Sequence, residues 1–108
     1  MNRNIIGTLI FRNEGNNCLT SKYFNGSAEG PFTETCKLKE ADKEWNDGFC
    51  GVYTTVWIED GHKHVKAELT INRLKNNTYK MKWTKKNNLI FEGIGMLVGD
   101  LLVGAYWD

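Results

Sequence analysis

The chain has 108 residues and a formal net charge of +1, with 14 Lys and Arg residues set against 13 Asp and Glu residues. This length predicts one domain, residues 1–108, which can bury a core without disulfide support. Charges of both signs are interspersed, so we expect no basic surface for nucleic acid or for an anionic membrane. No apolar run approaches the roughly 20 residues that a membrane helix needs.

The first residues run directly into the short apolar pair Ile5-Ile6, without the long apolar core of a signal peptide. A cytoplasmic, soluble protein is therefore expected, and a processed fragment of a secreted precursor is the alternative. Reduced thiols are expected at Cys18, Cys36 and Cys50, because the cytosol keeps thiols reduced. Neither these cysteines nor the two histidines have metal-ligand spacing, so we expect no metal site and no cofactor.

Strand-like segments separated by short turn signals begin at the N-terminus. Residues 5–12 and 18–25 flank a turn rich in Asn and Gly, and residues 32–39 alternate between polar and apolar side chains. Residues 41–48 are polar apart from Trp45 and predict a loop or a single helical turn. Glu34 shares the more apolar face of its segment, which predicts that it points inward.

The same pattern continues to the C-terminus. Segments 49–59 and 64–73 flank an Asp60-Gly61 turn, an arrangement that places Trp57 outside, near His64. A three-residue turn at 75–77 keeps Ile71 in register with Met81. Segments 79–83, 89–98 and 101–107 complete the set, and Gly99-Asp100 predicts a two-residue hairpin between the last two.

Parity along these last strands predicts which side chains face inward. An even-length turn after Trp83 puts Met81 and Trp83 on the same face as Ile94 and Met96, and the final hairpin then adds Val103. The same hairpin sets Glu92 opposite Trp107 on this inner face. The outer face would hold the remaining apolar residues: Phe91, Leu97, Leu102 and Tyr106.

About eight short strands joined mostly by hairpins predict an all-β fold, a single up-and-down antiparallel β-barrel. An even strand number lets the first strand pair antiparallel with the last, which removes both sheet edges. The interior of a barrel this small holds packed side chains or one small ligand.

Several motifs resemble avidin-type barrels, within the wider group of avidin-like and lipocalin-like (calycin-type) proteins. They are Tyr79-x-Met81-x-Trp83, Phe91-x-Gly93, a last strand ending in Trp107, the turn at Phe11-Arg12-Asn13, and Leu19-Thr20-Ser21-Lys22-Tyr23. The resemblance implies a small-ligand pocket lined by Trp83, Trp107, Phe91, Tyr23, Ser21 and Asn13. Parity alone places Phe91 on the opposite face.

Two carboxylates on the expected inner face allow two interpretations. A carboxylate inside a small barrel must be hydrogen-bonded, paired or neutral, because an isolated buried charge is very costly. Glu92 and Glu34 are therefore candidate polar anchors for a ligand. In the alternative interpretation, Glu92 is a rim residue or a partner of Arg73.

Three functions remain open from the sequence. The first is non-enzymatic binding of a small, partly apolar ligand between Trp83, Trp107 and Tyr23, with Glu92 or Asn13 fixing its polar end. The second is a packed barrel whose last two strands form a homo-oligomer or partner interface with their outer face. The third is an acid–base enzyme that uses interior carboxylates, which is less expected because no nucleophile–base pair is recognisable.

Overall fold

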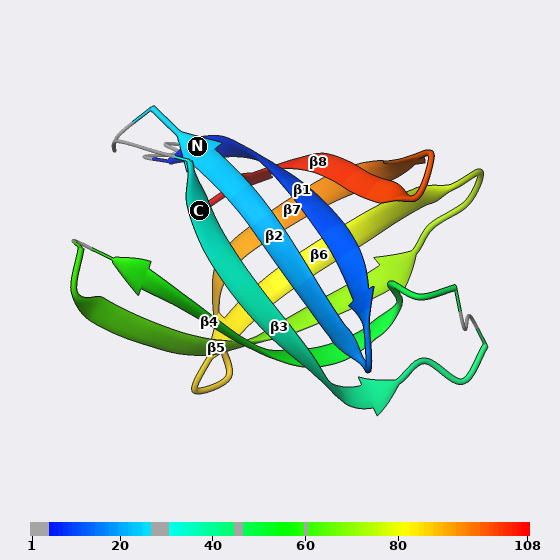
Figure 1. Ribbon diagram of the computed structural model, residues 1–108, viewed down its shortest axis with the longest axis horizontal. Coiled ribbons are helices and arrows are strands. Elements are labelled where there is room, and N and C mark those ends of the chain that lie inside the picture. Colours follow the sequence, from blue (N-terminus) through cyan, green and yellow to red (C-terminus); the bar gives the residue numbers. More distant parts are fainter. Residues whose placement is uncertain (1–4, 27–30, 45–46, 60) are drawn as a thin grey trace.

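A computed structural model describes residues 5–26, 31–44, 47–59 and 61–108, and its eight antiparallel strands close into a barrel (Figure 1). Each strand pairs with the next along the chain, and β8 pairs back to β1. The predicted up-and-down barrel is therefore confirmed. The strands are β1 (Ile6–Gly15), β2 (Cys18–Asn25), β3 (Phe32–Ala41), β4 (Gly51–Glu59), β5 (Lys63–Arg73), β6 (Thr78–Lys85), β7 (Asn88–Val98) and β8 (Leu101–Trp107).

Asparagines make the tight turns possible. Asn16 and Asn17 between β1 and β2 have positive φ angles of 52° and 60°, which a two-residue type I′ turn requires at both positions. Asn76 and Asn77 adopt similar angles between β5 and β6, and Ile71 pairs with Met81 as predicted. Asn tolerates this region because its side chain can hydrogen-bond locally.

The longest connection in the described chain joins β3 to β4. Its described residues, 42–44 and 47–50, contain no helix, so the predicted helical turn is absent from them, and Trp45 lies outside the described residues. Asp60 of the predicted β4–β5 turn also lies outside them. Within the described ranges, no helix is long and apolar enough to cross a membrane.

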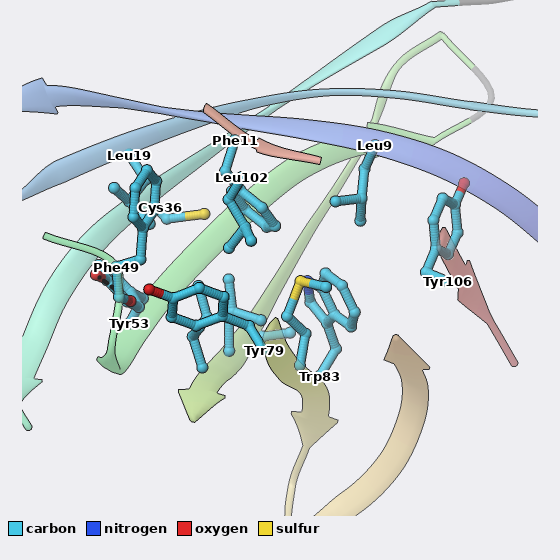
Figure 2. Close-up of a cluster of buried hydrophobic side chains, with 14 of the residues drawn as sticks. Leu9, Phe11, Leu19, Cys36, Phe49, Tyr53, Tyr79, Trp83, Leu102 and Tyr106 are labelled. Carbon is cyan, nitrogen blue, oxygen red and sulfur yellow. Dashed lines mark hydrogen bonds between the residues drawn. The ribbon is translucent and has the colours of Figure 1, made fainter. Parts of the chain in front are cut away.

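The core lies inside the barrel, where alternate residues of every strand point. Figure 2 shows much of this cluster, with Phe49 and Tyr53 toward one end of the barrel and Trp83 and Tyr106 toward the other. Met81 and Cys36 are fully buried, as their alternation predicts. All three cysteines are free, and Cys18 is partly exposed.

The β3–β4 connection closes one end of the barrel. Phe49 and Cys50 are buried, and Asp47 accepts a hydrogen bond of 2.6 Å from Tyr79 Oη. Arg73 Nη1 lies 3.9 Å from Asp47 Oδ2, and Asn13 Nδ2 donates to Gly48 O at 2.8 Å. These contacts hold the described residues of the connection against this end of the barrel.

The predicted inner face of β7 and β8 is wrong. Ile94 and Met96 are 53% and 55% exposed, Val103 is half-buried, and Leu102 is completely buried. The turn after β6 has two residues, as assumed, but Trp83 pairs with Phe91 while Thr84 pairs with Leu89. Ile90 is the extra residue of a β-bulge, and one extra residue reverses every side chain that follows it.

The predicted outer position of Trp57 is also wrong. Glu59 pairs with Lys63, so the β4–β5 turn has three residues and Trp57 pairs with Val65. Both side chains are buried inside the barrel. A two-residue turn would have placed Trp57 opposite His64, on the outside.

Candidate functional site

A cavity of about 280 Å³ opens at the end of the barrel opposite the β3–β4 connection. Its mouth is formed where β2, β4 and β8 end and where β3 and β7 begin. The side chains around it come from seven of the eight strands or their flanks. They are Ile5, Leu9, Tyr23, Asn25, Phe32, Glu34, Trp57, Ile58, Glu59, Trp83, Phe91 and Tyr106.

Aromatic side chains form a continuous wall around this cavity. The ring centroids of Trp57 and Phe91 lie 6.4 Å apart, and those of Phe91 and Tyr106 lie 5.8 Å apart. Tyr106 lies 6.1 Å from Tyr23, which lies 5.7 Å from Phe32. Most of these pairs have edge-to-face geometry, which favours the packing of the rings against one another.

Trp83 lies deeper, beneath the ring of Tyr106. Their centroids are 6.2 Å apart, and Trp83 stacks on Phe11 of the core at 6.5 Å (Figure 2). Trp83 is 4% exposed, so its indole ring forms part of the cavity floor.

Glu34 is the polar group of the cavity floor and is 3% exposed. Its Oε2 accepts hydrogen bonds from Thr55 Oγ1 at 2.5 Å and from Trp83 Nε1 at 2.8 Å. Cys36 Sγ donates in turn to Thr55 Oγ1 at 3.4 Å. The thiol and the hydroxyl thus form a chain of donors that ends on the carboxylate.

Burial raises the pKa of Glu34, because the charged form loses its hydration. The hydrogen bonds from Thr55 and Trp83 act in the opposite direction and favour the carboxylate. Ser21 stands opposite Glu34 in the β2–β3 register and has a smaller effect of the same sign. The Oγ of Ser21 is buried and lies outside hydrogen-bond geometry with every described partner.

Polar contacts hold the mouth of the cavity in place. Asn25 Nδ2 donates to Tyr106 Oη at 2.8 Å, and Trp57 Nε1 donates to Glu59 Oε1 at 3.1 Å. Tyr106 also pairs with glycines on both neighbouring strands. A Cβ atom at Gly7 would lie 2.4 Å from the ring of Tyr106, so only glycine leaves room for this ring.

The structure brings five of the eight predicted site residues together. Trp83, Tyr23, Phe91 and Glu34 line the cavity, and Ser21 lies buried beside Glu34. The β7 bulge turns Phe91 inward, against the parity argument and in agreement with the motif resemblance.

The other three residues lie elsewhere. Trp107 pairs with Glu92 as predicted and donates to it at 3.2 Å, but the bulge places this pair on the outer face, and both side chains are half-buried. Asn13 is at the closed end, where it holds the β3–β4 connection. Glu92 and Glu34 therefore lie on opposite sides of the barrel wall and form no interior pair of carboxylates.

Sequence reasoning missed Trp57 and Tyr106 as cavity residues. A three-residue β4–β5 turn would have placed Trp57 opposite Val65, on the same face of β5 as Ile71, which the sequence places in register with the inward Met81. The glycines at positions 7 and 93 were the available signal for Tyr106, because a large ring fits where both neighbours lack a side chain.

Among the described residues, no three His, Cys, Asp or Glu side chains are grouped so that they could hold a metal ion. The cavity contains instead an apolar wall, a buried carboxylate on its floor and a second carboxylate at its mouth. Comparisons of the chain with protein families, with curated proteins and with solved structures find no match.

Proposed function

We propose that this protein is a non-enzymatic barrel that binds one small, partly apolar molecule in its aromatic-lined cavity. The observation that carries the proposal is an open cavity of about 280 Å³ with Glu34 on its floor. Protein interiors are close-packed, with few voids larger than a water molecule. An apolar cavity that contains one oriented polar group is typical of small-molecule sites.

The motif resemblance supports the same class of function. Trp83, Phe91 and Tyr23, which the resemblance to avidin-like and lipocalin-like barrels singled out, line the cavity together. In this proposal Glu34 takes the anchoring role that the sequence also suggested for Glu92.

Indole, a compact neutral molecule with one N–H donor, is a suitable first probe. Titration of the ¹⁵N-labelled protein should give saturable amide shifts at Tyr23, Phe91 and Tyr106 and little change at Phe49 at the closed end. Native mass spectrometry of freshly purified protein would report a co-purified ligand directly.

A matched pair of variants distinguishes the interior from the surface. Leu9→Trp fills the cavity from β1, whereas Ile10→Trp adds the same ring to the outer face of the same strand. Binding of indole should be lost in the first variant and kept in the second, with both folds checked by circular dichroism. Equal binding by both variants would refute the proposal, as would no saturable shifts in the wild type with either indole or 2-phenylethylamine.

A second candidate function, self-association, is favoured by the outer face of β1, β7 and β8. The register aligns apolar residues in rows across these strands, such as Met96, Val103 and Ile10. Ile94, Met96, Val98 and Ile6 are all more than half exposed. Leu97, Leu102 and Tyr106, on which the sequence argument for this surface relied, point into the barrel instead, so different residues now form the surface.

A second copy of the chain is the proposed occupant of this surface. The central row, Ile94, Ala105 and Thr8, contains two small side chains, so two such faces can approach closely about a two-fold axis. Seven residue levels over the three strands β7, β8 and β1 cover roughly 300 Å². A stable interface buries about 800 Å² per partner, so a weak dimer is expected.

A further inference from the structure

The cavity lining contains two acidic groups and no basic group. Glu34 lies on the floor and Glu59 at the mouth, and none of the described lining residues is a lysine, an arginine or a histidine. A ligand that enters therefore meets only negative or neutral protein groups. A carboxylate ligand would be repelled by both glutamates, whereas a cation would be attracted by both.

Among the residues that the structure describes, Glu34 also has no ion-pair partner. The groups that act on it come from Thr55, Trp83, Ser21 and Cys36, all of them neutral, and Thr55 and Trp83 donate hydrogen bonds to its carboxylate. A buried charge is usually paired, because neutral hydrogen bonds recover only part of its lost hydration. An ammonium group placed against Glu34 would supply the missing positive charge and donate up to three hydrogen bonds.

The donors are oriented in a way that fits an ionised Glu34. Thr55 Oγ1 accepts from Cys36 Sγ at 3.4 Å, so its own proton is free to point at Glu34 Oε2, 2.5 Å away. The indole Nε1–H of Trp83 can only donate, and it donates to the same oxygen at 2.8 Å. Both of these hydrogen bonds end on Oε2, which leaves Oε1 as the oxygen for a ligand donor.

The aromatic wall suits the same kind of ligand. Trp57, Phe91, Tyr106, Tyr23 and Phe32 surround the space above Glu34, with neighbouring centroids 5.7 to 6.4 Å apart. Faces of aromatic rings attract cations, and they also pack against flat apolar groups. The cavity volume is at the small end of ligand pockets, which limits the ligand to a compact molecule.

We infer that the ligand of this cavity is a small organic cation, an amine carried on a compact aromatic or branched apolar body. Its ammonium group binds Glu34 at the floor, and its apolar body lies between Trp57, Phe91 and Tyr106. This inference rests on the proposed function, because it assigns a chemical class to the ligand of the same cavity.

Three ligands of nearly equal size test the charge requirement directly. Isothermal titration calorimetry at pH 7 should show 2-phenylethylamine binding roughly tenfold to a hundredfold more tightly than 2-phenylethanol, since a charge-assisted hydrogen bond replaces a neutral one. Binding of 3-phenylpropionate should be undetectable. Equal or tighter binding of the alcohol or the acid would overturn the inference, and this comparison needs no variant.

The role of Glu34 has a matched control on the outside of the barrel. Glu92 also accepts a hydrogen bond from a tryptophan Nε1, that of Trp107, but lies on the outer face. Glu34→Gln should weaken binding of the amine at least about tenfold and change binding of the alcohol little, while Glu92→Gln leaves both unchanged. Equal weakening of amine and alcohol by Glu34→Gln would overturn the charge-pairing role.

The results of these experiments distinguish a failure of the cation assignment from a failure of the proposed binding function. If indole binds in the cavity and 2-phenylethylamine does not, the cation assignment is wrong and the binding function remains. If neither indole nor the amine binds, the binding function fails and the inference fails with it.

Discussion

Glu34 is the residue with the largest conflict between its chemistry and its surroundings. It is 3% exposed, and its hydrogen-bond donors Thr55 and Trp83 are both neutral. Tyr23, Cys36 and Tyr106 also face it, and burial raises the pKa of each of them, that of Tyr23 to about 12. These three groups stay protonated near neutral pH. Glu59 lies at the mouth of the cavity rather than at its floor. The charge at the cavity floor therefore depends on whether Glu34 is protonated.

Glu34 should make the stability of the unliganded protein depend on pH. The folded pKa of Glu34 lies above its ordinary value of 4.5, so the folded state binds more protons than the unfolded state between the two values. The contribution of Glu34 is therefore fully present below pH 4.5 and is lost as the pH rises through the folded pKa. Glu34→Gln cannot titrate and should lack this loss.

Urea unfolding of wild type and Glu34→Gln from pH 4 to pH 8 checks this prediction. The difference in the free energy of unfolding should shift in favour of the variant as the pH rises. A difference that stays constant over this range would mean that Glu34 has the same pKa in the folded and unfolded states.

Asp47, at the closed end, should make stability depend on pH in the opposite direction to Glu34. Partial burial alone would raise the pKa of Asp47, but hydrogen bonds from Tyr79 and from the backbone N–H groups of Cys50 and Phe49 outweigh it and lower the pKa. Its stabilisation is present above its ordinary value of 3.8 and is lost as the pH falls through the folded pKa.

Asp47→Asn should accordingly cost about 1–3 kcal/mol at pH 7, because hydrogen bonds to a charged acceptor are lost. The cost, measured by thermal or urea unfolding, should shrink below about pH 4. Asp100→Asn, in the exposed β7–β8 turn, is the control and should change the free energy of unfolding by less than about 0.5 kcal/mol. Equal effects of the two substitutions would show that the Asp47 contacts contribute nothing.

In β7, a single extra residue determines which side chains of β7 and β8 face the core. Without the extra Ile90, Ile94 and Met96 would enter the barrel, and Leu97 would lie outside together with Leu102 of β8. With it, Trp83 pairs with Phe91, and Gly93 and Gly95 take inner positions beneath Tyr106 and Leu102. The bulge thereby turns Phe91 toward the cavity and leaves an apolar surface outside.

A pair of neighbouring substitutions in β8 tests this orientation. Leu102→Ala should reduce the free energy of unfolding by about 2–5 kcal/mol, because Leu102 is completely buried. Val103→Ala, one position along on the outer face, should cost less than about 1 kcal/mol. Urea unfolding measures both values. If Val103→Ala costs more than Leu102→Ala, then Val103 faces the core, as simple alternation predicts, and β7 has no bulge.

The barrel has one closed end, one open end and an apolar outer face on β1, β7 and β8. The β3–β4 connection crosses one end of the barrel (Figure 1), where Asp47, Phe49 and Tyr79 pack together. The other end opens into the cavity. Closure of β1 on β8 removes both sheet edges, so edge-to-edge pairing is not available for association. Association is therefore expected through the apolar outer face of β1, β7 and β8.

Sedimentation velocity over a range of protein concentrations tests this expectation. The wild type should show a monomer–dimer equilibrium, and Ile94→Lys should be monomeric, because it puts two charges into the apolar centre of the interface. Val56→Lys makes the same change at an exposed apolar residue on the opposite side of the barrel and should dimerise as the wild type does. A wild type that stays monomeric at high concentration would contradict the dimer.

Much of the fold is predictable from the sequence because its signals are local. Alternation and turn residues place all eight strands to within a few residues, and the strand number with short turns implies closure of β1 on β8. The inward position of Glu34 follows from alternation within one strand, and Ile71 opposite Met81 follows from one turn length. The polar floor of the candidate site was therefore predictable from the residues themselves.

The tertiary structure alone decided which face of the later strands points inward. An alternation argument carries the error of one missed bulge or turn to every residue beyond it. Because the bulge at Ile90 was not predicted, Leu102, Tyr106 and Glu92 were all assigned to the wrong face. Because the β4–β5 turn has three residues rather than two, Trp57 was assigned to the wrong face as well. Whether a bulge forms depends on how both neighbouring strands pack, and a linear pattern does not contain that information. In the cavity wall, which four strands beyond β3 complete around Glu34, alternation therefore misplaced Trp57, Phe91 and Tyr106, and the motif resemblance alone pointed to Phe91.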